Sequence, residues 1–256
     1  MIVIQLLKRY VKLDMQNKDY MKNILLKKNY NVWWQDKKIH GEKIDAAKRL
    51  YRNLINGLLK HHSLQKGKKL LDVACGTGEF MIEASKRGFY VYGIDLSDYA
   101  IKHAKKHAVG IFYVGSGENM PFKNNEFDYI VCIGSLEHFS RPDKGIAEMA
   151  RVLKKDGICV IHVPNLMFLG HIYMAYRYGV MPSEGEQQFS EIFYTYNGWK
   201  KLLEDNGFLV IDCTVVNDMS KTKKVSPYVK IIWQYLIRPF VPLHLSYAFN
   251  FYCRKK

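Results

Sequence analysis

The residues best suited to chemistry lie in the run KLLDVACGTGEF at positions 69–80. Residues 70–73 are mostly apolar, which is typical of a short strand covered on both faces. Gly76 and Gly78 lack a Cβ, so the backbone can approach a ligand closely at both positions. Glu79 follows at once, and its carboxylate would repel a phosphate. The run therefore predicts a strand that ends in a binding loop, for a ligand other than a nucleotide phosphate.

This loop resembles the first motif of class I S-adenosylmethionine (SAM)-dependent methyltransferases, whose usual form is Asp/Glu-x-Gly-x-Gly-x-Gly. It stands here as Asp72-x-Ala74-x-Gly76-x-Gly78, with alanine in place of the first glycine. The Gly-x-Gly-x-x-Gly spacing of dinucleotide-binding loops is absent from it. The resemblance implies SAM as cofactor and S-adenosylhomocysteine (SAH) as product, and a sulfonium suits Glu79 better than a phosphate does. The cofactor-binding residues implied in the loop are Asp72, Ala74, Cys75, Gly76, Thr77 and Gly78.

Two further segments resemble the same family. In GIDLS, Asp95 ends the next predicted strand, where a carboxylate can accept both ribose hydroxyls. The segment SGENMPF resembles the family's Asp-Ala-Glu-x-x-Pro-Phe loop over the adenine, with Ser116 and Gly117 replacing the usual Asp and Ala. The resemblance adds a second set of cofactor-binding residues: Asp95, Leu96, Ser116, Gly117 and Glu118.

A fourth segment, FDYIVCIGSLEHF, adds Ile133, Gly134 and Ser135 to the predicted cofactor site and supplies the candidate catalytic residues Glu137 and His138. Methyl transfer from a sulfonium is an in-line displacement, so positioning the acceptor matters most. A hydroxyl acceptor also has to lose a proton, and a histidine has a suitable ordinary pKa to take it. The alternative is that His138 starts a helix and packs against the cofactor. No other acid or histidine stands at a metal-ligand spacing from this pair, so we expect no metal.

Strands and helices alternate after the loop, which predicts an α/β fold with a parallel, doubly wound sheet. The family resemblance implies a Rossmann-like sheet of seven strands in the order 3-2-1-4-5-7-6, with the last strand antiparallel. After the strand that precedes the loop, the expected strands are 90–94, 111–114, 127–133, 158–163, 208–216 and 245–253. The expected helices are 43–62, 81–88, 97–107, 143–153 and 197–205.

The chain divides into a helical N-terminal extension or lid at 1–64 and a methyltransferase domain at 65–256. That domain carries two substrate-side insertions, at 164–194 and 217–244. The first is rich in aromatic residues, and long irregular connections are usually functional. In the second, residues 226–236 predict a helix whose apolar face and lysine flanks suit a membrane surface. Packing of this helix against the domain is the alternative.

The formal net charge is +15, and most of the 39 basic residues are lysines. Lysine more often makes a solvated surface than a phosphate-recognition patch, so we do not expect nucleic acid as a partner. The five cysteines form no C-x-x-C pair and predict buried thiols in a reducing compartment. Signal-peptide features and an apolar run of about 18 residues are absent. We therefore expect a cytoplasmic protein, with peripheral membrane contact left open.

The leading functional hypothesis is methyl transfer to a small-molecule acceptor, aromatic or lipid-linked, with O-methylation favoured. The tandem Trp33-Trp34, the Leu-Glu-His triplet and the stretch MPSEGEQQF resemble polyprenyl-phenol O-methyltransferases of quinone biosynthesis. An RNA or protein methyltransferase would fit the basic charge, but GSLEH stands where amino-group modifiers carry Asn/Asp-Pro-Pro-Tyr. A non-catalytic SAM-binding protein is the third hypothesis. The sequence does not predict the oligomeric state.

Overall fold

A computed structural model describes residues 25–35, 44–61, 67–168, 172, 176, 192–216 and 240–256. Over these residues seven strands form one sheet: β1 (Lys69–Val73), β2 (Tyr90–Asp95), β3 (Ile111–Val114), β4 (Phe127–Ile133), β5 (Leu153–Pro164), β6 (Phe208–Val216) and β7 (Ala248–Lys255). The named helices are α2 (Ile44–His61), α3 (Glu79–Ser85), α4 (Asp98–His107), α5 (Pro142–Val152) and α7 (Tyr196–Asp205), with 3₁₀ turns η1 (Leu136–His138) and η4 (Leu243–Leu245). Residues 25–35 form one more helix.

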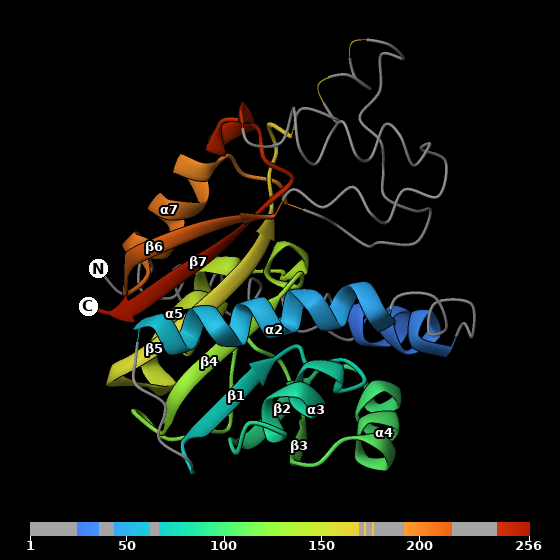
Figure 1. Cartoon of the computed structure of the whole chain (residues 1–256). Helices are drawn as coiled ribbons and strands as arrows, with labels where there is room; N and C mark the ends of the chain where they lie inside the picture. The colour runs from blue at the N-terminus through green and yellow to red at the C-terminus, as the bar shows by residue number, and fades with distance from the viewer. Residues whose placement is uncertain are drawn as a thin grey trace, which may run out of the picture.

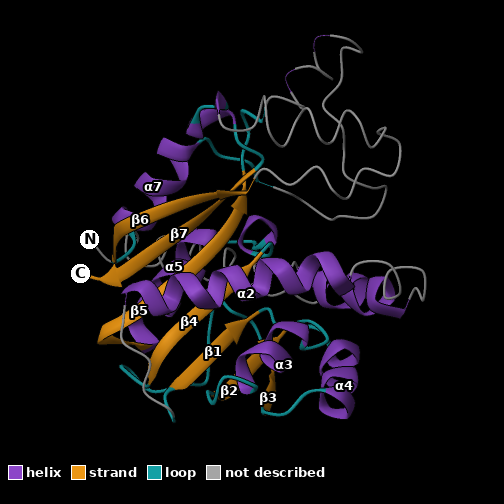
Figure 2. Cartoon of the chain, viewed as in Figure 1, coloured by secondary structure: helices purple, strands orange, loops and turns teal. Residues whose placement is uncertain are grey.

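The strand order is β3-β2-β1-β4-β5-β7-β6, and β7 runs antiparallel to both β5 and β6. This confirms the predicted α/β, Rossmann-like, doubly wound sheet. Figures 1 and 2 show the strands fanning across the molecule, with α2 crossing one face and α5 lying behind the other. The carboxyl ends of β1, β2 and β4 meet at one edge, which is where an open α/β sheet binds its ligands.

Two apolar cores cover the two faces of the sheet, because successive side chains of a strand point in opposite directions. In β1, Leu70 packs into the core under α2 and α3, whereas Leu71 packs into the core under α5 and α7. Tyr129 and Ile130 alternate in the same way along β4. Helices on both faces explain why these strands read as continuous apolar runs.

Several predicted boundaries were wrong, and β5 is the clearest case. The turn expected at Asp156-Gly157 lies inside β5, which begins at Leu153 because Leu153 already pairs with Phe127 of β4. The register shifts between Phe127 and Tyr129 and absorbs the irregular residues. The last strand begins at Ala248 rather than at residue 245, because residues 243–245 form the 3₁₀ turn η4.

The helix at 25–35 lies over the start of α4. Asn31 Oδ1 accepts hydrogen bonds from the Ser97 hydroxyl and from the Tyr99 N–H, and the Lys27 ammonium pairs with Asp98 at 2.8 Å. The division of the chain at residue 64 stays a prediction. The predicted helix at 226–236 and most of both predicted insertions lie outside the described residues. In the part of the chain that the structure describes, none of the helices is both long and apolar enough to cross a membrane.

Candidate functional site

The loop between β1 and α3 turns three times through left-handed backbone. Ala74 has φ +59°, Gly76 φ +53° and Gly78 φ +84°. Glycine adopts these angles without cost, whereas a left-handed alanine costs about 1–2 kcal/mol. The alanine that replaces the family's first glycine therefore stores strain at the bottom of the loop.

Gly76 and Gly78 are also required for space. A Cβ on Gly76 would lie 2.6 Å from the Trp34 ring, and a Cβ on Gly78 would lie 3.1 Å from the Cβ of Ala108, just after α4. The first distance shows that an aromatic ring of helix 25–35 lies directly on the loop. The second lets α4 pack close to the start of α3.

Asp95 ties this loop to the start of α4. One carboxylate oxygen accepts the Gly76 N–H at 2.9 Å, and the other accepts the Ser97 N–H at 2.8 Å. Ser97 in turn caps α4 by accepting the Ala100 N–H. The predicted ribose acid is thus also a structural link between two segments of the site.

The loop after β3 forms a third wall. The Ser116 hydroxyl accepts the Glu118 N–H at 3.1 Å, and Glu118 Oε1 accepts the Arg141 N–H at 3.1 Å. A Cβ on Gly117 would lie 2.7 Å from the Phe139 ring. Phe139 therefore explains why this chain carries glycine where the family usually has alanine.

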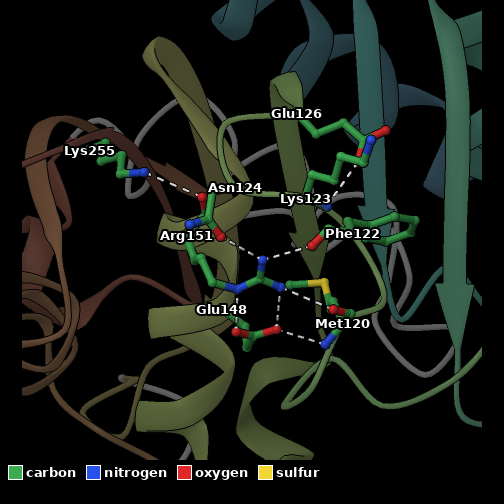
Figure 3. Close-up of polar contacts among 8 residues, drawn as sticks. All are labelled: Met120, Phe122, Lys123, Asn124, Glu126, Glu148, Arg151 and Lys255. Carbon is green, nitrogen blue, oxygen red and sulfur yellow. Dashed lines mark hydrogen bonds and ion pairs between the residues drawn. The ribbon is translucent and has the colours of Figure 1, made fainter.

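An ion pair on α5 supports that wall from outside (Figure 3). The guanidinium of Arg151 donates to Glu148 from two nitrogens at 2.6 and 2.8 Å, and also to the carbonyl oxygens of Met120 and Phe122. Glu148 Oε2 accepts the Met120 N–H at 2.7 Å. The hydrogen bond from Arg151 lowers the pKa of Glu148, so this pair stays charged and fixes the backbone of residues 120–122.

These walls enclose one cavity of about 240 Å³. Most of the predicted site residues line it: Ala74, Cys75, Gly76, Asp95, Leu96, Ser116, Gly117, Glu118, Ile133, Gly134, Ser135 and His138. Four predicted residues lie outside the lining: Asp72, Thr77, Gly78 and Glu137. Asp72 is buried in β1 beneath the loop, and the Thr77 hydroxyl donates to Glu79 within the loop.

Sequence reasoning missed the aromatic side of the cavity. Leu26, Tyr30, Trp33 and Trp34 from helix 25–35 and Tyr51 from α2 line it, and Trp33 and Trp34 pack edge to face at 4.7 Å. The tandem tryptophans before an amphipathic helix were the sequence feature from which this aromatic wall could have been predicted. Their position on the glycine loop is visible only in the fold.

Several carboxyl groups lie in the walls of the cavity or directly beneath them. Burial, followed by the nearby carboxylates of Asp95 and Glu79, raises the pKa of Asp72 well above its usual range. Burial also raises the pKa of Asp95, although two backbone N–H groups oppose that shift. The pKa of Tyr51 is raised by burial and then by Glu79 and Asp72. Neighbouring carboxyl groups make it harder for one another to ionise, and a cationic ligand would stabilise their ionised form.

The two candidate catalytic residues lie in η1, directly after β4. The His138 side chain is 10% exposed, and its Nε2 lies 4.0 Å from Glu137 Oε1. His138 faces the cavity while Glu137 is buried behind it. An imidazole at this place can accept a proton from a group bound in the cavity, and the adjacent carboxylate can stabilise the resulting imidazolium.

His162 at the end of β5 is a further polar residue that the sequence analysis passed over. Its Nδ1 lies 2.7 Å from Asn250 Oδ1, and Asn250 Nδ2 donates to the Thr214 hydroxyl at 3.1 Å. An amide oxygen only accepts, so Nδ1 carries a proton and the neutral ring has its lone pair on Nε2. Its Cδ2 lies 3.9 Å from the Cβ position of Gly134 in the cavity wall. A lone histidine in the apolar run of 158–163 was the signal.

The residues present fit the cofactor that the sequence resemblance implies. A left-handed glycine loop admits close backbone approach, Asp95 is an acceptor at the carboxyl end of β2, and the walls combine carboxylates with aromatic rings. These groups suit a ligand with hydroxyls, a sulfonium and an ammonium. Among the residues that the structure describes, His, Cys, Asp and Glu side chains form no cluster of three that could hold a metal ion.

Residues 71–161 match a family described as "Methyltransferase domain". The demethylmenaquinone methyltransferase of Staphylococcus aureus is 30% identical over 174 residues, which cover 59% of this chain and 72% of that protein. The enzyme of the same name from Corynebacterium kroppenstedtii is 34% identical over 120 residues, which cover 46% of this chain and 52% of that protein. The matched part is thus only about half the length of the second relative.

The fold is similar to that of magnesium protoporphyrin IX methyltransferase from Synechocystis, solved with bound SAH. The TM-score is 0.66 at 15% sequence identity, and the match covers 91% of this chain and 99% of that one. At that identity the likeness concerns the fold.

Proposed function

Since the chain belongs to the SAM-dependent methyltransferases and SAM is its cofactor, we propose that it methylates a small, planar aromatic acceptor, with a hydroxyl as the favoured methyl-accepting group. The observation that carries the proposal is the set of groups that line one cavity. The glycine loop, Asp95, the aromatic rings of helix 25–35 and His138 of η1 all contribute to its walls.

The walls support an aromatic acceptor because flat rings stack on and pack edge to face with other rings. Tyr30, Trp33, Trp34 and Tyr51 offer such surfaces. Two of the relatives are named for demethylmenaquinone. We therefore place a lipid-linked ring, such as a phenol or a hydroquinone, first among the acceptors to be tested.

In this proposal the loop from Asp72 to Gly78 holds the methionine part of the cofactor, and Asp95 with Leu96 holds its ribose. Ser116, Gly117 and Glu118 cover the adenine, with their loop fixed by Arg151 and Glu148. Ile133, Gly134 and Ser135 complete the cofactor site after β4. SAM supplies an electrophilic methyl group in such a site.

His138 takes the hydroxyl proton of the acceptor onto its ring as the oxygen attacks, and Glu137 stabilises the imidazolium that results. General-base catalysis of this kind contributes about 10²- to 10⁴-fold. Positioning of the acceptor within the aromatic walls supplies the larger part of the rate, because in-line displacement depends on alignment.

A label-transfer assay tests the proposal. The purified protein is incubated with SAM carrying a radioactive methyl group and, separately, with phenols, demethylated naphthohydroquinones, total RNA and a protein extract. Label in an organic phase with the phenols or hydroquinones is expected, and product mass spectrometry with NMR identifies oxygen or carbon as the acceptor atom. Label in RNA or protein alone would replace the proposal with one of the sequence-based alternatives. Calorimetric SAM binding without transfer to any acceptor would favour the non-catalytic one.

A further inference from the structure

The cavity has a charge pattern that contrasts with the whole chain. The formal net charge is +15, yet no Lys or Arg occurs among the described residues that line the cavity. Its charged walls come from Glu79, Asp95 and Glu118, and Asp72 is buried directly beneath the loop. Although the chain is rich in lysine, the described part of it places no basic side chain in the cavity wall.

The aromatic rings lie on the same side as two of these carboxylates. Trp34 touches the loop at Gly76, where a Cβ would lie 2.6 and 2.7 Å from two ring atoms. Tyr51 packs edge to face on Phe80, one residue beyond Glu79, at 5.6 Å between ring centres. The face of an aromatic ring attracts a cation within about 6 Å. The aromatic rings and the carboxylates near the glycine loop therefore both favour a positively charged ligand.

Helix 25–35, the darker blue helix in Figure 1, brings two of these rings and is fastened beside the ribose acid. Asn31 binds the Ser97 hydroxyl and the Tyr99 N–H, while the Ser97 N–H binds Asp95. The position of the aromatic wall is therefore linked by two hydrogen bonds to the cofactor side of the cavity.

We propose that Trp33, Trp34 and Tyr51, together with Glu79 and Asp95, make this cavity selective for the positively charged cofactor over its neutral product. Methyl transfer breaks the bond from sulfur to the methyl carbon, and the electron pair stays on sulfur while the acceptor forms the new bond. The sulfonium becomes a neutral thioether, so the attraction of the rings and carboxylates is lost in the reaction itself. The proposal rests on the cofactor alone and holds for any acceptor.

Calorimetry with three ligands tests the proposal: SAM, SAH, and sinefungin, in which a protonated amine takes the place of the sulfonium. The wild-type protein should bind SAM and sinefungin at least about 10-fold more tightly than SAH, at about 0.15 M salt. Trp34→Leu should reduce that preference by about 3- to 10-fold, while the affinity for SAH changes less than about threefold. Trp34→Phe keeps an aromatic face and should keep most of the preference.

Phe139→Leu is the matched control, because Phe139 is an aromatic ring that also lines the cavity but packs on Gly117 in the loop after β3. It should affect all three ligands alike. Glu79→Gln removes one charge and should lower the preference even if Trp34→Leu fails to fold. Equal affinities of the wild-type protein for SAM, sinefungin and SAH would overturn the proposal. So would an equal loss for all three ligands in Trp34→Leu, or an unchanged preference in both Trp34→Leu and Glu79→Gln.

Discussion

Replacement of Asp95 by alanine should damage both the empty protein and its complex with SAM, for separate reasons. The carboxylate accepts the Gly76 and Ser97 N–H groups at 2.9 and 2.8 Å, and the residue is 8% exposed. Hydrogen bonds to charged groups contribute about 1.5–3 kcal/mol each. Burial of the carboxyl opposes this gain, as its raised pKa indicates. We therefore expect a net loss of about 2 kcal/mol in the free energy of unfolding.

The loss in SAM binding should be of similar size. If the carboxylate also accepts both ribose hydroxyls, Asp95→Ala should weaken SAM binding by about 2 kcal/mol, or roughly 30-fold. Urea unfolding without ligand measures the first effect, and calorimetry of the folded variant measures the second. Asp95→Asn keeps one acceptor oxygen and should fall between wild type and alanine on both scales.

Asp98→Ala is the matched control, because it removes the same charge three residues later. Asp98 is exposed and pairs only at the surface with Lys27 at 2.8 Å. Such a pair is worth less than about 1 kcal/mol, so SAM affinity should stay within about threefold. Unchanged SAM affinity in folded Asp95→Ala would refute the ribose assignment, and unchanged stability would refute the role of Asp95 as a link between the loop and α4.

Three more changes test other parts of the site. Ala74→Gly removes left-handed strain of about 1–2 kcal/mol and costs about 0.5–1 kcal/mol of chain entropy. Urea unfolding should therefore show a free energy of unfolding about 0.5 kcal/mol higher than that of the wild type. A lower free energy of unfolding would contradict the strain at Ala74. Arg151→Met should lower the free energy of unfolding by about 2 kcal/mol at pH 7, and Arg151→Lys should lower it less. The pKa of Glu148 is lowered in the folded state, so the ion pair stabilises the fold above the ordinary glutamate pKa and stops doing so as the pH falls through the folded pKa. Urea unfolding between pH 3 and 7 would check this loss. His138→Gln should lower kcat/KM by about 10²- to 10⁴-fold and remove its rise with pH, with SAM affinity within about threefold. A near-normal rate would leave positioning alone as the catalytic factor.

The amino-acid sequence determined the individual strands and the glycine loop, because both depend on local patterns, whereas the strand order was predicted from the family resemblance. Apolar runs bounded by glycine and acid predicted β1, β2 and β4, and the spacing of Gly76 and Gly78 predicted the turn that now shows left-handed backbone. Helix boundaries were predicted to within one or two residues where a cap such as Ser97 marks them. The start of β5 was predicted wrongly, because pairing of Leu153 with Phe127 outweighed the turn preference of Asp156-Gly157.

Only the tertiary structure decided which distant residues complete the cavity. Trp34 precedes Gly76 by 42 positions, and no periodicity in the sequence indicates that its ring lies on that glycine. His162 and Asn250 are 88 positions apart and meet because β5 and β7 pair antiparallel. A residue's type and its neighbours in the chain fix local backbone preferences, whereas contacts across strands and helices depend on how the whole core packs. The aromatic wall and the charge pattern of the cavity are of this second kind.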